Sequence, residues 1–414
     1  MSDPSFVLPQ YGSRCFADLP GAVLSWLTGA NASTLSTDIT SPLADRYDQV
    51  VLLFLDGCGW RFVEPFLKRS PLLQRINADG LLTPITAQFP STTAAHVTAI
   101  HTGLPVGQSG VFEWQYYEPT LDAVIASLLF SFAGDKQRDT LKTIGVNPAQ
   151  LYPKQTLYNE LKRRGVRSTV LQHRGYTPST YSNIVLKGAK VIPYATLPEA
   201  LVLLRGLLKK HTGPAYHVLY FDNVDDICHR HGPGSVYAEA ETDALLTLLE
   251  RFLFQALEPT LRRTLFVLTA DHGQVDVSPK TTVYLNQDRR FEGFERLLRK
   301  NGQGKLLAPA GSPRDFFLYV NEEHLEEALT FFSDRLEGTA VVRRVSDLIS
   351  EGYFGPLPCS DVFLSRVGNL VILPYAGESV WWYEKDRFQQ RFFGHHGGLT
   401  AQEMVIPLML YPVG

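Results

Sequence analysis

Aspartate and histidine recur where apolar segments of this chain end. Three such segments, 48-DQVVLLFLDG-57, 215-AYHVLYFDNVD-225 and 264-TLFVLTADHG-273, finish on a carboxylate, and 394-GHHGG-398 places a histidine pair between glycines. Six side chains that bind zinc-type metals stand at these points: Asp56, Asp225, His229, Asp271, His272 and His396. Each alone also fits an ordinary turn, strand end or polar loop. Together they are a nitrogen and oxygen donor set that predicts a metal site.

A pair of threonines opens the small-residue stretch 90-PSTTAAHVTAIHTG-103. One interpretation is an ordinary helix N-cap, in which a hydroxyl accepts from an orphan backbone N–H. The other is a nucleophile, because a hydroxyl at a helix N-terminus and on a divalent cation loses its proton near neutral pH. The neighbouring metal-type ligands favour a nucleophile in this stretch.

The six ligands divide naturally between two ions rather than one. A catalytic zinc ion usually has three protein ligands and an open position. Two such ions about 4 Å apart form a clamp for in-line displacement at phosphorus. The sequence therefore predicts a binuclear site, with zinc as the expected ion and manganese as an acceptable one.

Charge arithmetic bears on the substrate of such a site. Two zinc ions carry four positive charges, while three aspartates and a threonine alkoxide carry four negative ones. A phosphodiester adds a single negative charge, whereas a phosphomonoester adds up to two and needs a further cation such as an arginine. Arg61 and Arg314 are the candidates for that cation, and neither stands next to the threonines. The balance favours phosphodiesters.

Alternating strands and helices must position these residues. Continuous apolar runs at 48–57, 166–172, 215–225 and 264–273 are typical of buried parallel strands, and 155–165, 197–210 and 236–257 are helical patterns. This alternation predicts an α/β fold with a mostly parallel central sheet flanked by helices. Ligands bind beyond the carboxyl ends of the strands in such sheets, so the aspartates converge there.

A second pattern begins near residue 276. Strands are expected at 316–320, 340–345 and 367–374, with helices at 322–338 and 346–355. We interpret residues 276–372 as a small α+β subdomain inserted into a catalytic core formed by residues 1–275 and 373–414.

The motifs, taken in order, resemble the nucleotide pyrophosphatase/phosphodiesterase (type I phosphodiesterase) branch of the alkaline phosphatase superfamily. The resemblance covers Asp56-Gly57, an F-P-x-x-T stretch ending at Thr93, D-x-x-x-H-x-x-G-P from Asp225, D-H-G from Asp271 and G-x-H-G from Gly394. It implies an alkaline-phosphatase-like sandwich and a phosphothreonine intermediate on Thr93. It also implies the ligand sets of two zinc ions: Asp225, His229 and His396 for one, and Asp56, Thr93, Asp271 and His272 for the other.

Substrate contacts are expected from four further side chains. His96, three residues after Thr93, could donate a hydrogen bond to a phosphate oxygen or pack within its helix. Trp114 and Tyr116, in 112-FEWQYYEP-119, could stack on a leaving group or simply fill the core. Arg314, in 311-GSPRD-315, could neutralise a phosphate or lie elsewhere.

The bulk properties limit the function classes. The net charge of −3 gives no support for a nucleic-acid polymer as partner. The sequence has no stretch of about 18 uncharged apolar residues and no secretory signal at its start, so a cytoplasmic location is expected. We expect a small-molecule phosphate ester or phosphonate as substrate. Alternatives are a phosphonate hydrolase that cleaves a C–P bond, a phosphomonoesterase, and a non-catalytic metal-stabilised binding protein. The oligomeric state is not indicated.

Overall fold

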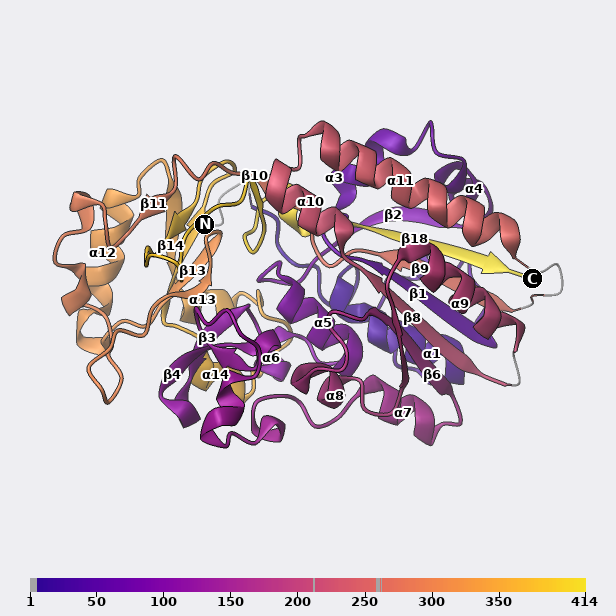
Figure 1. Ribbon diagram of the computed structural model, residues 1–414, viewed down its shortest axis with the longest axis horizontal. Coiled ribbons are helices and arrows are strands. Elements are labelled where there is room, and N and C mark those ends of the chain that lie inside the picture. The colour runs from indigo at the N-terminus through magenta and orange to yellow at the C-terminus, as the bar shows by residue number, and fades with distance from the viewer. Residues whose placement is uncertain (1–5, 211–212, 258–260, 262) are drawn as a thin grey trace.

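A seven-stranded sheet forms the centre of the protein in a computed structural model that describes residues 6–210, 213–257, 261 and 263–414 (Figure 1). In spatial order its strands are β2 (Leu81–Thr86), β18 (Val405–Val413), β9 (Thr264–Thr269), β1 (Gln49–Leu55), β8 (Ala215–Phe221), β6 (Arg167–His173) and β7 (Lys190–Tyr194).

The sheet is parallel from β9 to β7. Strand β18 runs antiparallel to both β9 and β2. The three central strands β9, β1 and β8 are buried along their whole length, which explains their continuous apolar sequences. The predicted mostly parallel sheet is confirmed, with an antiparallel strand near one edge.

Helices cover both faces of this sheet (Figure 1). One face carries α3 (Trp60–Val63), α4 (Pro71–Asp79), α9 (Leu197–Lys209), α10 (Asn223–His231) and α11 (Val236–Phe252). The other carries α1 (Leu19–Thr28), α5 (Thr93–Thr102), α7 (Leu157–Arg163) and α8 (Thr180–Val185). Side-chain caps fix several of the helix starts: the hydroxyls of Thr196 and Ser235 accept from backbone N–H groups at the starts of α9 and α11.

A smaller unit lies beside the main sheet and has its own core. Its antiparallel sheet has the order β12 (Ala310–Ser312), β13 (Asp315–Leu318), β15 (Leu370–Pro374) and β14 (Ala340–Arg344). Helix α12 (Leu325–Arg335) packs on this sheet through Ala328 and Phe332, and α13 (Val345–Ser350) follows β14. Phe291, Phe316 and Ile372 belong to the same separate hydrophobic cluster.

This smaller unit extends beyond the predicted end at residue 372. Strand β15 continues to Pro374, and β16 (Val380–Trp381) pairs with β11 (Val283–Tyr284). The chain leaves the core at β10 (Val275–Asp276) and returns at β17 (Gly394–His395), and these two short strands pair with each other. We therefore propose that the insert extends to about residue 393; a sheet with only two residues per strand gives no clear signal in the sequence.

Several short elements complete the fold. They are α2 (Thr37–Thr40), α6 (Val106–Ser109), α14 (Asp361–Arg366), α15 (Ala401–Met404) and the meander β3 (Gln115–Glu118), β4 (Ala123–Ala126) and β5 (Ser131–Phe132). Within the described part of the chain, no helix combines the length and the apolar character that crossing a membrane requires.

Candidate active site and metal centre

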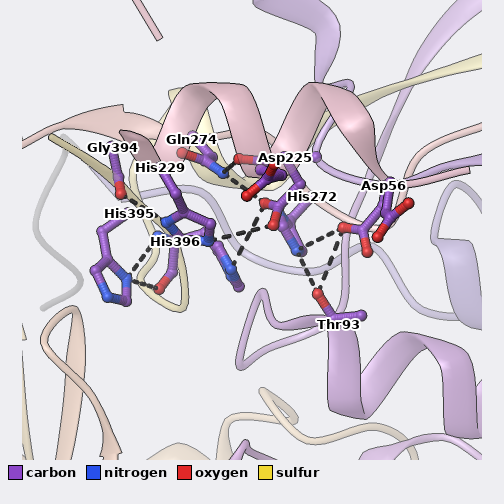
Figure 2. Close-up of polar contacts among 12 residues, drawn as sticks. Asp56, Thr93, Asp225, His229, His272, Gln274, Gly394, His395 and His396 are labelled. Carbon is purple, nitrogen blue, oxygen red and sulfur yellow. Dashed lines mark hydrogen bonds and ion pairs between the residues drawn. The ribbon is translucent and has the colours of Figure 1, made fainter. Parts of the chain in front are cut away.

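The ends of three neighbouring strands bring the predicted ligands together (Figure 2). Asp56 directly follows β1, and Asp271 and His272 come just after β9. Asp225 and His229 share one face of α10, which begins immediately after β8. Because β9, β1 and β8 are adjacent and parallel, their carboxyl ends converge on one edge of the sheet.

Gly57 allows this convergence. Its backbone φ is +67°, a conformation that residues other than glycine rarely adopt. A Cβ at this position would also lie only 2.8 Å from the Cβ of Asp225. The Asp-Gly pair therefore ends β1 in a turn and also lets α10 approach the end of β1.

Thr93 is the first residue of α5, and its hydroxyl points into the site (Figure 2). Its Oγ1 lies 3.1 Å from Nε2 of His272 and 3.4 Å from Oδ1 of Asp56. Thr92 occupies the N-cap position, although its side chain makes no capping hydrogen bond. The structure therefore separates the two threonines, and only Thr93 contacts the predicted ligands.

Three histidines use the same ring nitrogen, Nδ1, to contact a backbone carbonyl, which leaves Nε2 for the carboxylates. Nδ1 lies 2.8 Å from the carbonyl of Gly394 in His229, 2.9 Å from that of Ser91 in His396, and 3.0 Å from that of Gly273 in His272. A carbonyl only accepts, so Nδ1 carries the hydrogen in each neutral ring and Nε2 keeps a lone pair.

The three Nε2 atoms face carboxylate oxygens, and Nε2 of His272 also faces the hydroxyl of Thr93. Nε2 of His229 lies 3.2 Å from Asp225, and Nε2 of His272 lies 3.4 Å from Asp271 and 3.5 Å from Asp56. Nε2 of His396 is 3.9 Å from Asp225. Lone pairs of neutral imidazoles and carboxylates facing one another are what metal ligation requires, so these residues fit divalent cations.

Burial raises the pKa values of two carboxylates in the site, Asp56 and Asp271. Burial, together with the charges of Asp271 and Asp225, raises the pKa of Asp56 well above its ordinary value. Burial also raises the pKa of Asp271 to about 7. For Asp225, burial acts in the same direction, but the neighbouring His229 outweighs it and holds the pKa below its ordinary value. A cation among these groups would favour their ionised forms.

The structure contains two sets of three candidate ligand residues, and within each set the ligand atoms lie within 4.8 Å of one another. The sets are Asp225, His272 and His396, and Asp56, Asp271 and His272. His272 belongs to both sets and therefore lies between the two positions. Its ring stacks on that of His396 with the centroids 3.6 Å apart. His229 reaches the first set through its contact with Asp225.

His96 does not face the site, and this corrects its expected role. It is fully buried; Nδ1 donates to the carbonyl of Thr92 at 2.7 Å, and Nε2 accepts from the backbone N–H of Gln88 at 2.8 Å. Burial lowers its pKa to about 3, so the ring is neutral. Both nitrogens are occupied by backbone groups, which leaves none for a phosphate.

Arg314 and Tyr116 are also misplaced by the sequence interpretation. Arg314 is fully buried and forms a two-pronged ion pair with Glu403, with both N···O distances at 3.0 Å. Tyr116 is fully buried and stacks on Phe112. Neither side chain is available to a substrate, because each is enclosed at the junction of the core with the smaller unit.

Trp114 lies beside Thr93, and its role as a substrate contact stays a prediction. It is 42% exposed and lines two cavities, which also share Thr93 and His229. One cavity of about 730 Å³ extends past Asp56, and the other, of about 710 Å³, extends past His396.

Two other residues of the site, Tyr220 and Gln274, were missed. Tyr220 donates its phenolic hydrogen to Oδ2 of Asp56, and Gln274 donates its amide hydrogen to Oδ1 of Asp225. Glu113 is 1% exposed and lines the second cavity. Gln274 follows His272 by two residues, which is a weak signal, whereas the contact of Tyr220 depends on the pairing of β8 with β1.

Comparison with known proteins agrees with this geometry. A family model for type I phosphodiesterase / nucleotide pyrophosphatase matches residues 50–399. Mouse ectonucleotide pyrophosphatase/phosphodiesterase family member 1 is 24% identical over 293 residues, which are 68% of this chain and 30% of the mouse protein. The chain thus spans about 30% of the length of that curated relative.

Two solved structures have a similar fold. Murine ectonucleotide pyrophosphatase/phosphodiesterase 5 superposes with a TM-score of 0.63 at 16% identity, over 88% of each chain. Phosphonoacetate hydrolase from Sinorhizobium meliloti 1021 superposes with a TM-score of 0.58 at 16% identity, over 89% of this chain and 91% of its own. These likenesses confirm the predicted alkaline-phosphatase-like α/β fold. With the match of the family model over most of its length, the chain belongs to the type I phosphodiesterase / nucleotide pyrophosphatase family.

Proposed function

We propose that the protein hydrolyses phosphodiester bonds of small molecules, with Thr93 as nucleophile and two divalent cations, zinc first among them, in the site. The observation that supports this most is the position of the Thr93 hydroxyl, 3.1 Å from the Nε2 lone pair of His272 and 3.4 Å from Asp56. A hydroxyl at a helix N-terminus and among metal-type ligands is the arrangement of an activated nucleophile.

The donor sets suggest how the residues divide. Asp225, His229 and His396 would hold one cation, and Asp56, Thr93, Asp271 and His272 the other. When bound, such cations lower the pKa of a coordinated hydroxyl or water and neutralise charge that develops on the phosphorus oxygens. Oxygen and nitrogen donors of this kind accept manganese as well as zinc.

The protein's own residues supply the rest of the reaction. The hydroxyl of Thr93 gives up its proton and its Oγ1 attacks phosphorus, the bond to the leaving oxygen breaks, and a proton passes to the departing alcohol. A phosphothreonine diester remains. Water then attacks the same phosphorus, the Thr93–phosphorus bond breaks, and Thr93 regains its hydrogen. The fixed start of α5 holds the nucleophile in one place through both displacements.

Two cavities favour a diester over a monoester. A diester carries two organic substituents, and two cavities of about 730 and 710 Å³ are both lined by Trp114 and Thr93. The two arginines that the sequence offers as partners for a second phosphate charge are engaged elsewhere, since Arg314 pairs with Glu403 and Arg61 contacts Asp276.

Relatives add support for the nucleophile. One structure of murine ectonucleotide pyrophosphatase/phosphodiesterase 5 is described as inactive through a threonine-to-alanine substitution and in complex with AMP; it superposes with a TM-score of 0.61 at 16% identity. In that protein the threonine-to-alanine form is inactive and holds AMP, so nucleotide esters are a first substrate class to test on this chain.

The central test is the variant Thr93→Ala. We expect it to lose turnover of bis-(p-nitrophenyl) phosphate by about a thousandfold or more, because the attacking oxygen is gone. Zinc content measured by elemental analysis should stay near that of the original protein, because most ligands remain. Thr92→Ala is the matched control and should keep most of the activity.

The same assay separates the substrate classes. We expect kcat/KM for bis-(p-nitrophenyl) phosphate to exceed that for p-nitrophenyl phosphate on the zinc-loaded protein, and both activities to disappear on chelation. Substantial turnover by Thr93→Ala would sink the nucleophile assignment. A preference for the monoester would instead require a cation beside the phosphate, with Arg138 in the first cavity the first to replace.

Phosphonate hydrolysis is the second candidate. The solved phosphonoacetate hydrolase superposes over 89% of this chain, nearly the same coverage as the murine phosphodiesterase. Release of inorganic phosphate from phosphonoacetate, in preference to cleavage of the diester, would assign this activity.

A further inference from the structure

Each of the three carboxylates in the site has one oxygen held by a protein donor and another facing a histidine. Asp271 shows the pattern with backbone donors. Its Oδ1 accepts from the N–H groups of Gly57 and His272, both at 3.0 Å, and its Oδ2 lies 3.4 Å from Nε2 of His272. Oδ2 is buried and has no hydrogen-bond partner among the described residues.

The other two carboxylates receive side-chain donors instead. The phenol of Tyr220 donates to Oδ2 of Asp56, whose Oδ1 is the atom that faces His272 and Thr93. The amide of Gln274 donates to Oδ1 of Asp225 and, at 3.1 Å, to the backbone carbonyl of the same residue (Figure 2). Oδ2 of Asp225 faces His229, and Oδ1 also lies 3.9 Å from Nε2 of His396. Both donors are largely enclosed: Gln274 is fully buried and Tyr220 is 8% exposed.

The two donors reach the site from different elements. Tyr220 is part of β8 and contacts the residue that follows β1, so its hydroxyl crosses between adjacent parallel strands. Gln274 follows β9 and contacts α10. Each touches a single carboxylate, and the two carboxylates fall in different sets of candidate ligands.

We propose that Tyr220 and Gln274 are positioning residues that separately set the cation affinity of the two halves of the site, Tyr220 through Asp56 and Gln274 through Asp225. Each donor fixes the rotamer of its carboxylate and thereby orients the oxygen lone pairs that a cation would meet. Loss of such outer hydrogen bonds typically weakens metal binding by about ten- to a hundredfold.

This inference rests on the proposed cation-dependent function, and zinc binding tests both. The variants are Tyr220→Phe and Gln274→Met, which keep the approximate shape of each side chain and remove its donor. Tyr216→Phe is the matched control: Tyr216 lies on β8, is fully buried, and its hydroxyl has no hydrogen-bond partner among the described residues.

Zinc dissociation constants should be measured by competition with a chromophoric chelator, independently of activity. We expect two bound zinc ions in the original protein and in Tyr216→Phe. Tyr220→Phe and Gln274→Met should each weaken one of the two by about tenfold or more and leave the other nearly unchanged, and the double variant should weaken both.

Variants that lack a ligand of one cation show which of the two zinc ions each donor affects. With His396→Ala, the remaining zinc should be weakened by Tyr220→Phe and not by Gln274→Met. With Asp56→Ala, the remaining zinc should be weakened by Gln274→Met, and Tyr220→Phe should have no effect because its acceptor is absent.

The outcomes distinguish this inference from the proposed function. Absence of zinc binding in the original protein would overturn both. Two tightly bound zinc ions whose affinities are unchanged in Tyr220→Phe and Gln274→Met would overturn the positioning roles alone, as would an equal loss in Tyr216→Phe. Circular dichroism verifies folding; if Gln274→Met does not fold, the comparison of Tyr220→Phe with Tyr216→Phe decides.

Discussion

Whether a histidine has a ring nitrogen available for a cation depends on the atoms that surround the ring, and His96 and His396 differ in this respect. Both are neutral, since burial lowers the pKa of His96 to about 3 and that of His396 to about 4. Both ring nitrogens of His96 form hydrogen bonds with backbone groups. In His396 only Nδ1 does so, and Nε2 faces Asp225. The sequence predicts that both histidines are near Thr93, but it does not show which way a ring on a helix points.

We expect His96→Phe to change stability more than catalysis. The substitution leaves the buried N–H of Gln88 without its partner, at a cost of about 1–3 kcal/mol, while the carbonyl of Thr92 keeps the backbone N–H of residue 96. Urea unfolding measures that loss. The kcat/KM of the folded fraction should fall far less than in Thr93→Ala; an equal fall would restore His96 as a catalytic candidate.

At the scale of elements, one hairpin fixes the loop that carries His396. Ser312, at the end of β12, contacts the carbonyl of His396 at 3.1 Å, and Arg314 pairs with Glu403. Glu403 in turn accepts from the backbone N–H of Gly398 at 3.0 Å. The expected phosphate-binding arginine therefore acts as part of the support for a ligand loop.

We expect Arg314→Ala to destabilise the protein by about 3–5 kcal/mol, because it leaves the buried Glu403 carboxylate without its partner. Arg344→Ala is the control, since Arg344 pairs with Glu326 on the surface and such pairs contribute about 0–1 kcal/mol. Chemical denaturation of both variants measures the difference. Equal effects would mean that the ion pair does not support the loop.

The sequence predicted some elements well and others not at all. The apolar runs of β1, β8 and β9 and the residues at their ends are strong local signals. The edge strand β2 and the antiparallel β18 both contain proline and pair far along the chain, so their sequences alone do not show the pairing. The meander from β3 to β5 has strands of two to four residues, too short for a periodic pattern.

At the scale of the whole molecule, the junction of the two units encloses a pair of acids. Glu113 precedes β3 and Asp315 begins β13, and both are almost completely buried. Burial raises the pKa of Glu113 from its ordinary 4.5 to about 8. Burial and the charge of Glu113 raise the pKa of Asp315. The junction thus holds protons at neutral pH that the unfolded chain has released.

The raised pKa of Glu113 predicts that the free energy of unfolding decreases as the pH rises. The stability from Glu113 is present below about pH 4.5 and is lost as the pH rises through about 8, because the raised pKa belongs to the folded state. One such proton changes the free energy of unfolding by up to about 1.4 kcal/mol per pH unit. In Glu113→Gln the free energy of unfolding should fall less steeply between about pH 6 and about pH 8. Parallel slopes, measured by urea unfolding, would contradict this assignment.

The short pairing of β10 with β17 has a consequence for chain entropy. His272 stands just before the chain enters the smaller unit and His396 just after it returns, and their ligand atoms lie within 4.8 Å of each other and of Asp225. A cation bound by both would act as a cross-link that closes a loop containing the whole smaller unit. Closing a long loop limits the freedom of the unfolded chain more than closing a short one. Cation binding would then stabilise the attachment of the smaller unit to the core, in addition to the buried Arg314–Glu403 pair that joins them.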